Sequence, residues 1–122
     1  PGNWALLVDD NNEVTTFYSR IAEALKLRYN TAASVKEALN IVEANGKPRL
    51  VITDIQLGDS SGLDLVRDLR RQFGTALPVI VVSGKADDSL AATIRKAGAT
   101  TYLTKPVGRQ RLFSEIQEVL SK

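Results

Sequence analysis

The chain has 122 residues and a net charge of +2, and 43% of its residues are hydrophobic. This size and composition are typical of one compact domain with a core of its own. The chain contains no Cys and no His, which excludes disulfides, thiolate or histidine metal sites, and catalysis by a thiol or an imidazole. Any metal must therefore be held by oxygen ligands, which favours magnesium or calcium.

Membranes and nucleic acids are not expected as partners of this domain. No apolar run approaches the roughly 18 residues of a membrane span, the first residues lack a signal-peptide pattern, and basic residues are interspersed with acidic ones. We therefore expect a cytoplasmic protein. Because the chain does not begin with Met, we expect a single domain over residues 1–122, with a core over about 4–120, excised from a larger multidomain protein.

The first half of the chain predicts two strands and two helices. Residues 4–8 form an apolar run typical of a buried strand, and 11–27 follow with helical periodicity. Residues 29–33 are a weaker strand candidate. The next helix begins with a capping-box pattern over 34–37 and ends at Gly46. The apolar stripe expected to bury the first helix consists of Val14, Phe17, Ile21 and Leu25.

The second half continues this alternation of strands and helices. The expected strands cover 50–53, 79–83 and 101–104, and the expected helices cover about 61–72, 87–97 and the segment after Pro106. In the helix over 61–72, charges of opposite sign lie three residues apart and predict a solvated face with salt bridges. These charged residues are Asp64, Arg67, Asp68 and Arg71.

Continuous apolar strands, each followed by a helix, predict a parallel sheet that is covered on both faces and joined by right-handed crossovers. The weak second strand suits the edge of such a sheet. We therefore predict an α/β fold with a doubly wound, five-stranded parallel sheet of order 2-1-3-4-5, the flavodoxin-like (βα)5 arrangement. In this order a ligand site lies beyond the carboxyl ends of the strands, where the first and third strands meet.

Chemically active side chains follow four of the expected strands. Asp9 and Asp10 follow the first strand, Asp54 follows the third, Ser83 ends the fourth and Lys105 follows the fifth. A single Asp at a strand end is most often part of a turn or a cap. Because the carboxyl ends of parallel strands meet at one edge, however, these side chains should converge, and clustered carboxylates require a hard divalent cation, a raised pKa or both.

The converging side chains suit the transfer of a phosphoryl group. Magnesium is the cation that best suits a phosphate-handling site built from oxygen ligands. Lys105 and Ser83 can hold two phosphoryl oxygens. Asp54 is then left as the nucleophile, because a carboxylate can form an acyl phosphate without help from a histidine.

These residues lie in motifs that resemble the receiver domains of two-component response regulators, the family of the chemotaxis regulator. The resemblance covers residues 4–120 and includes Gly62, eight residues after Asp54. The motifs are Leu7-Val8-Asp9-Asp10, Val51-Ile52-Thr53-Asp54, Val81-Val82-Ser83-Gly84 and Leu103-Thr104-Lys105-Pro106.

The resemblance implies a role for each of these residues. Asp54 accepts a phosphoryl group, Ser83 and Lys105 bind that group, and the Lys105–Pro106 peptide bond is cis. The implied magnesium ligands are Asp9, Asp10, Asp54 and the backbone carbonyl of Gln56.

Three further residues are implied to control the signal. Tyr102 matches the aromatic residue that turns inward when Ser83 moves toward the phosphoryl group, although a half-buried strand aromatic is the alternative interpretation. Gln56 and Lys85 match positions that look out over the phosphoryl group and influence its lifetime. Neither side chain is a carboxylate base, so we expect slow self-dephosphorylation.

The resemblance also implies partners. A histidine kinase or a histidine phosphotransfer protein is the expected phosphodonor. The responding surface is expected on the fourth helix, the fifth strand and the fifth helix, around Arg95, Tyr102 and Arg109, where an output domain or a partner protein would bind. Dimerisation on phosphorylation stays an open alternative.

One residue departs from the usual receiver pattern. Gly58 stands where many receivers have Pro, which should loosen the loop without removing a side-chain ligand.

Two classes of enzyme are not expected. An enzyme that turns over an aspartyl phosphate needs a second acid where this chain has Gln56, and no glycine-rich nucleotide motif is present. We therefore do not expect an enzyme, and the open alternative is a binding module of the same fold that works without phosphorylation.

Overall fold

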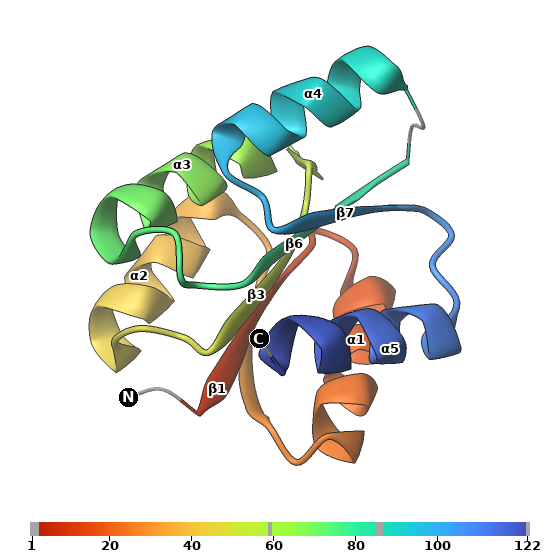
Figure 1. The fold of residues 1–122 in the computed structure, drawn as a ribbon. Helices are drawn as coiled ribbons and strands as arrows, with labels where there is room; N and C mark the ends of the chain where they lie inside the picture. The colour runs from red at the N-terminus through yellow and green to blue at the C-terminus, as the bar shows by residue number, and fades with distance from the viewer. Residues whose placement is uncertain (1–2, 59, 85–86, 122) are drawn as a thin grey trace.

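A five-stranded parallel sheet forms the centre of the molecule (Figure 1). The computed structural model describes residues 3–58, 60–84 and 87–121. All neighbouring strands of the sheet are parallel, and their order confirms the predicted fold class and the order 2-1-3-4-5. The strands lie side by side as β2 (Arg28–Ala32), β1 (Trp4–Val8), β3 (Leu50–Asp54), β6 (Val79–Ser83) and β7 (Thr101–Thr104).

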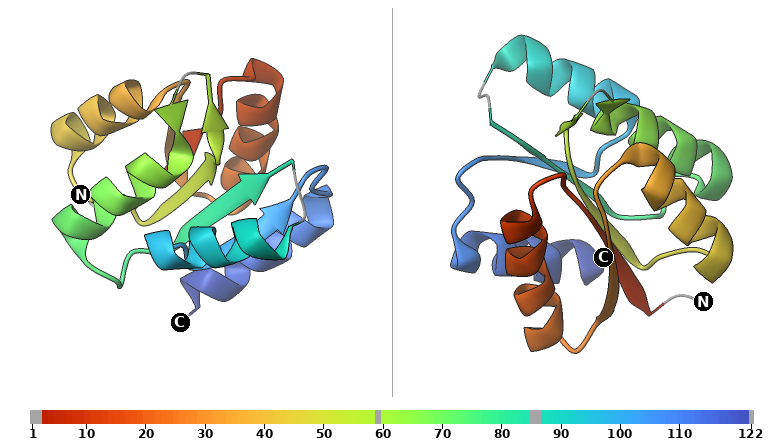
Figure 2. Two further views of the ribbon diagram at one scale, coloured as in Figure 1. Left: turned by 90° about the horizontal axis from the view of Figure 1, so that it is seen from above. Right: turned by 180° about the vertical axis from the view of Figure 1, so that it is seen from behind.

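Helices cover both faces of this sheet (Figures 1 and 2). One face carries α1 (Asn12–Ala24) and α5 (Arg109–Leu120). The other face carries α2 (Val35–Asn45), α3 (Gly62–Phe73) and α4 (Asp88–Ala97). Among the described helices, none combines the length and the apolar character that crossing a bilayer requires.

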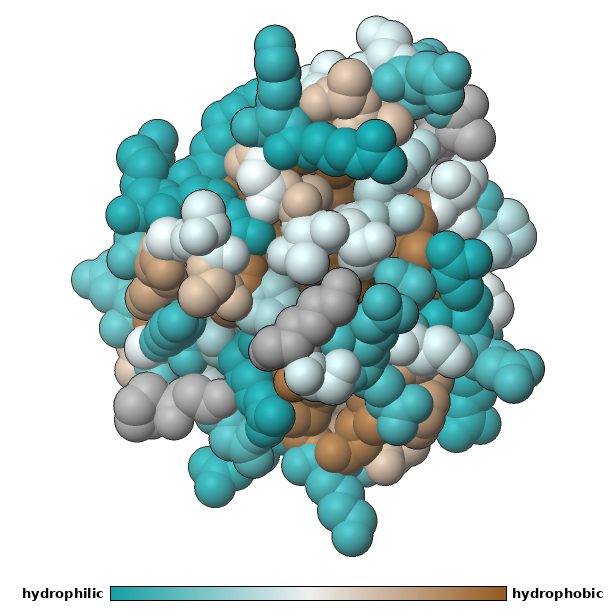
Figure 3. All heavy atoms as spheres, viewed as in Figure 1, coloured by the Kyte–Doolittle hydropathy of each residue, from teal (hydrophilic) through white to brown (hydrophobic). Residues whose placement is uncertain are grey.

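Alternate residues of the central strands supply two separate cores. Leu6 and Val8 belong to the core that includes residues of α2, α3 and α4, whereas Ala5 and Leu7 belong to the core that includes residues of α1 and α5. Each fully buried aliphatic side chain contributes about 1.5–3 kcal/mol to stability. The face drawn in Figure 3 is largely hydrophilic, and no large hydrophobic side chain among the described residues is exposed.

A short hairpin after β3 was not predicted. It consists of β4 (Gln56–Leu57) and β5 (Ser60–Ser61), which pair antiparallel. Gly58 has a φ of 62° there, a left-handed conformation that Gly adopts easily. Pro could not adopt it, because its ring holds φ near about −65°. Gly58 therefore suits this turn, where Pro would not fit, and the looser loop stays a prediction.

The first helix is shorter than predicted, because α1 ends at Ala24 instead of near residue 27. Lys26 has a positive φ of 59°, and the amide of Leu27 donates to the Ala22 carbonyl at 2.9 Å. This turn reverses the chain so that β2 begins at Arg28. The predicted stripe is also incomplete, because Tyr18 is among the fully buried residues of the helix.

Two local predictions for helices are confirmed with small differences. At the start of α2, the Ser34 hydroxyl accepts from the Glu37 amide at 3.1 Å, while the Glu37 carboxylate accepts from the Ala33 amide at 2.6 Å, one residue earlier than the standard capping box. On α3, Arg67 pairs with Asp64 at 3.3 Å. The second predicted pair, Arg71 with Asp68, is also present.

Candidate functional site

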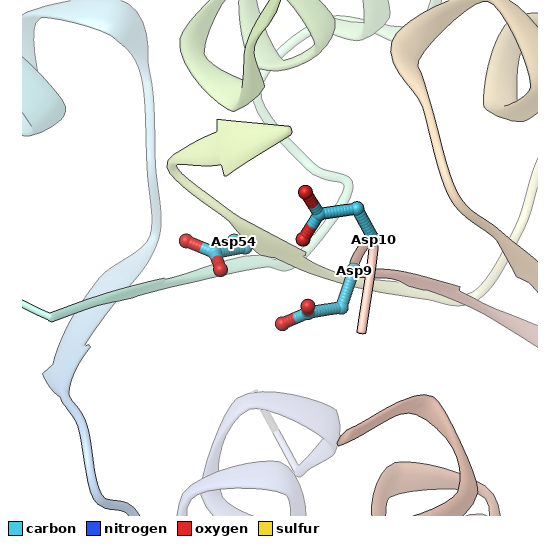
Figure 4. Close-up of side chains that lie close together, drawn as sticks. All are labelled: Asp9, Asp10 and Asp54. Atoms are coloured by element: carbon cyan, nitrogen blue, oxygen red, sulfur yellow. The ribbon is translucent and has the colours of Figure 1, made fainter. Parts of the chain in front are cut away.

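Three carboxylates gather where β1 and β3 end (Figure 4). One oxygen from each of Asp9, Asp10 and Asp54 lies within 4.8 Å of the others. Asp9 and Asp54 are buried, with exposed fractions of 2% and 7%, whereas Asp10 is exposed. The convergence predicted from the strand ends is thus present in the structure.

Each carboxylate is oriented by a backbone amide. Asp9 accepts from the amide of Asn11 at 2.9 Å and Asp10 from the amide of Gly58 at 3.1 Å. Asp54 accepts through Oδ1 from the amide of Gln56 at 3.0 Å. The loop after β1 and the hairpin after β3 therefore fix the carboxylates, while the second oxygen of each remains for other partners.

Lys105 lies between two of these carboxylates. Its ammonium donates to Oδ2 of Asp54 at 2.7 Å and to Oδ2 of Asp9 at 3.2 Å. Its backbone amide donates to the Ser83 carbonyl at 2.7 Å, which aligns the end of β7 with the end of β6. The Lys105–Pro106 peptide bond is cis, as the resemblance implied.

Burial and charge act against each other in this cluster. Burial raises the pKa of Asp9 above its ordinary value, and the Asp54 charge adds to this, although the Asn11 amide and Lys105 lower the pKa in part. Burial lowers the pKa of Lys105, but its hydrogen bonds with Asp54 and Asp9 and their negative charges outweigh burial and raise that pKa. The ammonium is therefore firmly protonated and offsets part of the carboxylate repulsion.

A cavity of about 700 Å³ opens beside the carboxylates. Its lining includes Asp54, Gln56, Ser83 and Lys105, so most of the predicted phosphoryl-binding residues share one space. Ser83 is 1% exposed, and Gln56 is exposed on β4. Lys85, the other residue predicted to affect phosphoryl lifetime, lies outside the described residues.

Tyr102 lies on the same face of the sheet as Ser83. Tyr102 pairs with Val81 across β6 and β7, and Ser83 is two residues further along β6, where side chains point to the same side. Tyr102 is half-buried and packs against the core that includes residues of α2, α3 and α4. This is the position that a residue coupled to Ser83 needs, although the switch itself stays a prediction.

The structure shows why position 62 needs Gly, which the motif alone did not explain. A Cβ at this position would lie 1.9 Å from the carbonyl oxygen of Asp54. That carbonyl accepts from the hydroxyl of Thr53 at 2.9 Å, and the Gly62 amide donates to the Ile55 carbonyl at 2.6 Å. The start of α3 thus packs directly on the backbone of Asp54, where only Gly fits.

Residues 5–117 match the model of the response regulator receiver domain family. The chain belongs to this family. The match covers most of the chain and includes every side chain of the carboxylate cluster. The structural neighbours show the same fold: a CheY-like response regulator receiver domain protein from Methanospirillum hungatei superposes with a TM-score of 0.89 at 28% identity, covering 99% of this chain and 95% of that one.

Curated relatives of this receiver domain are longer response regulators. The KDP operon transcriptional regulatory protein KdpE of Escherichia coli is 32% identical over 117 residues, which are 96% of this chain and 51% of that protein. The response regulator protein PilR of Pseudomonas aeruginosa is 37% identical over 109 residues, or 88% of this chain and 24% of that protein. The receiver domain thus spans about half, or less, of these relatives.

The donor set of this receiver domain fits magnesium. Three carboxylates offer hard oxygen ligands. Burial and the charge of Asp54 raise the pKa of Asp9, and the positive charge of a cation would act against both effects by stabilising the ionised carboxylate. The backbone carbonyl of Gln56 remains the predicted fourth protein ligand, and no contact in the structure tests it.

We expect magnesium to stabilise the receiver domain against thermal unfolding by about 1.4 kcal/mol once free magnesium is about tenfold above its dissociation constant. Asp10→Asn should lose most of this gain, because it removes one carboxylate from the cluster at an exposed position. Asp68→Asn, which changes an acid on α3 outside the cluster, is the control. Equal stabilisation of both variants by magnesium would argue against the assigned ligands.

Proposed function

We propose that this receiver domain accepts a phosphoryl group on Asp54 and changes conformation in response. The observation that carries this proposal is the position of Lys105, whose ammonium contacts Asp54 and Asp9 at the edge of a cavity that Ser83 also lines. A buried carboxylate next to a cation and a hydroxyl is arranged for phosphoryl transfer rather than for stability alone.

In the proposed transfer, one bond to phosphorus forms and one breaks. A carboxylate oxygen of Asp54 attacks the phosphorus of a phosphohistidine, the new O–P bond forms, and the N–P bond breaks. The electron pair of that bond stays on the imidazole, which takes up a proton. Lys105 and Ser83 hold phosphoryl oxygens during the transfer. Small acyl phosphates such as acetyl phosphate can serve as donors by the same displacement.

The carboxylate cluster also has a role in the proposed transfer. Asp9, Asp10 and Asp54 would hold magnesium, together with the Gln56 carbonyl. When bound, magnesium supplies positive charge that offsets the charge on the transferring group. The backbone amides of Asn11, Gly58 and Gln56 keep the carboxylates oriented for this task.

The proposed response surface consists of α4, β7 and α5, around Arg95, Tyr102 and Arg109. Its α4 helix is tied at one end, because the Arg70 guanidinium of α3 donates to the carbonyl of Gly98 at 2.8 Å, directly after α4. The other end of α4 follows the loop after Ser83. A movement of Ser83 is therefore expected to change the start of α4 more than its end, and an output domain or a partner protein would detect the change there.

We also propose that the phosphoryl group is lost slowly. The Gln56 side chain is an amide and cannot remove a proton from an attacking water. Gln56→Ala should therefore lose phosphate at least as fast as the unchanged domain, and a loss at least threefold slower would show that Gln56 assists hydrolysis. Lys85 is proposed to act in the same direction, by binding phosphoryl oxygens or blocking water.

Phosphorylation-independent binding by the same fold is the second candidate function. The intact carboxylate cluster with its bridging ammonium favours phosphorylation, since a module that does not use the site has no need of two buried carboxylates. The deciding experiment treats the domain with magnesium and acetyl phosphate or a phosphohistidine protein, followed by mass-spectrometric mapping. A hydroxylamine-labile phosphoryl group on Asp54 supports the proposal, and its absence with both donors contradicts it.

We expect Lys105→Ala to accept phosphate yet lose the conformational response, because the ammonium connects Asp54 to β7. In metal-free buffer it should also be less stable by about 1–2 kcal/mol, since the buried carboxylates lose their cation. Amide exchange of residues 88–104, before and after phosphorylation, measures the response, and Lys36→Ala on α2 is the control. A response equal to that of the unchanged domain would make Lys105 a bystander.

A further inference from the structure

Arg70, in the last turn of α3, is a half-buried cation that pairs with no carboxylate among the described residues. Burial lowers its pKa, but the ordinary pKa of arginine is so high that the guanidinium stays charged. Removing a charge from water is costly unless the charged group is hydrogen-bonded. This guanidinium therefore needs acceptors of another kind.

Its acceptors include the carbonyl groups at the C-terminal ends of two helices. Nε donates to the carbonyl of Gly98 at 2.8 Å, and Nη1 donates to the carbonyl of Gly74 at 2.9 Å. Gly74 is the C-cap of α3, and Gly98 is the C-cap of α4. The C-terminal end of a helix carries free carbonyls and a partial negative charge. One cation therefore caps both helices.

The same guanidinium also contacts the segments that lead into two strands. Nη1 donates to the carbonyl of Leu77, before β6, at 2.6 Å, and Nη2 donates to the hydroxyl of Thr100, before β7, at 3.3 Å. Thr100 is joined in turn to Val79, because its hydroxyl accepts from the Val79 amide at 2.9 Å and its amide donates to the Val79 carbonyl at 2.8 Å. The C-terminal end of α4 is thus fixed to α3 and to the sheet.

Gly98 allows the Arg70 side chain to lie close to the end of α4. A Cβ at position 98 would lie 2.9 Å from Cγ of Arg70, and the φ of 109° at Gly98 is one that favours Gly. The two helices lie side by side (Figures 1 and 2). The side chain of Arg70 therefore packs over the end of α4 as well as donating to it.

The two halves of α4 are held unequally. Its buried residues, Ile94 and Ala97, both lie in the second half, next to the contact with Arg70. In the first half, Leu90 is only partly buried and lines the cavity of the phosphoryl site together with Ser83. A helix that is packed and capped at one end and loosely packed at the other opens and moves most easily at the loose end.

We propose that Arg70 is a positioning residue that fixes the C-terminal end of α4 as a pivot, so that phosphorylation moves the first half of this helix. The proposal rests on the proposed function of Asp54 and names the residue that decides where α4 changes. The contacts of Arg70 lie where β6 and β7 begin, at the opposite end of the sheet from the carboxylates, so they should persist in both states. A contact that is equal in two states does not shift the equilibrium between them. Arg70 therefore directs the movement without changing the affinity for the phosphoryl group.

The test compares Arg70→Met with the unchanged domain, because Met keeps an unbranched side chain and removes every donor. Beryllofluoride, which takes the place of a phosphoryl group on a carboxylate, is added with magnesium, and amide exchange is measured along α4 with and without it. In the unchanged domain, beryllofluoride should change exchange mainly at residues 88–92.

In Arg70→Met the change should extend through residues 93–98. Resting exchange at these residues should also be about tenfold faster, the effect of losing one hydrogen bond to a charged group. The affinity for beryllofluoride should stay within about twofold of that of the unchanged domain, since the contact is equal in both states. A side chain that only stabilised the fold would speed resting exchange without moving the site of the response.

Arg67→Met is the matched control, because Arg67 lies on the same helix, is exposed and pairs with Asp64 at 3.3 Å. Its response should equal that of the unchanged domain. Should Arg70→Met not fold, Arg70→Lys takes its place, because Lys keeps the charge but lacks the planar fork that reaches both helices.

A response that stays within residues 88–92 in the Arg70 variant would overturn the role of Arg70, because the packing of Ile94 and Ala97 would then be sufficient to fix the helix. A response that is equal along all of α4 in the unchanged domain, or absent from α4, would also overturn it, and so would a larger loss of beryllofluoride affinity in the variant. Failure of the unchanged domain to bind beryllofluoride would instead contradict the proposed function.

Discussion

Asp54→Asn is expected to take up no phosphoryl group from acetyl phosphate or from a phosphohistidine protein. The amide has nearly the shape of the carboxylate, but it lacks the anionic oxygen that attacks phosphorus. The neighbouring carboxylates cannot substitute for it. Asp9 is held by Lys105 and the Asn11 amide, and neither Asp9 nor Asp10 is among the residues that line the cavity shared by Ser83 and Lys105.

The measurement is the mass of the intact domain after incubation with magnesium and either donor. Asp64→Asn, which removes an exposed acid on α3, should be phosphorylated like the unchanged domain. Circular dichroism of both variants checks that each is folded. Phosphorylation of Asp54→Asn to the level of the Asp64→Asn control would show that another residue is the acceptor, and the proposed function would need a different nucleophile.

Gly62→Ala is expected to destabilise the domain by about 3 kcal/mol, at the upper end of the usual cost of an added methyl group in a packed site. The new Cβ would lie 1.9 Å from the carbonyl oxygen of Asp54, and the backbone that carries each of these two atoms is held at other points. The Ile55 carbonyl accepts from the Gly62 amide, so α3 cannot move away without losing this hydrogen bond.

The same substitution should slow phosphoryl uptake, because relieving the clash displaces Asp54. Urea unfolding measures the stability, and the rate of labelling by acetyl phosphate measures the uptake. Gly108→Ala is the control, since a Cβ there meets nothing within 4 Å and φ is −71°. Its stability should change by no more than about 1 kcal/mol, the scale of an N-cap replacement. Equal midpoints for the two variants would contradict the steric account of Gly62.

Patterns within short segments were sufficient to predict most of the fold. The apolar runs of β1, β3 and β6 and the caps of α2 are properties of neighbouring residues, so they can be recognised without knowing the partners. The charged face of α3 follows from spacing alone, and the structure confirms its ion pairs. The ends of elements were less certain, because α1 stops where the chain must turn to enter β2 rather than where its periodicity fades.

One residue could have been recognised earlier from the same patterns. Tyr18 lies four residues after Val14 and three before Ile21, which places it on the predicted apolar stripe of α1. That the Tyr18 hydroxyl would be buried without a partner, however, follows from the packing of α1 on the sheet and could not be inferred from the spacing.

The α/β class, the strand order and the convergence of Asp9, Asp54 and Lys105 could all be predicted from the sequence, because strand ends of a parallel sheet meet at one edge. Which atoms meet at that edge could not be predicted in this way and is seen in the folded domain alone. Lys105 contacts Asp9 across 96 residues of chain and Asp54 across 51, and the clash that requires Gly62 involves the backbone of Asp54. Contacts of this kind depend on how whole elements pack, which no local pattern specifies.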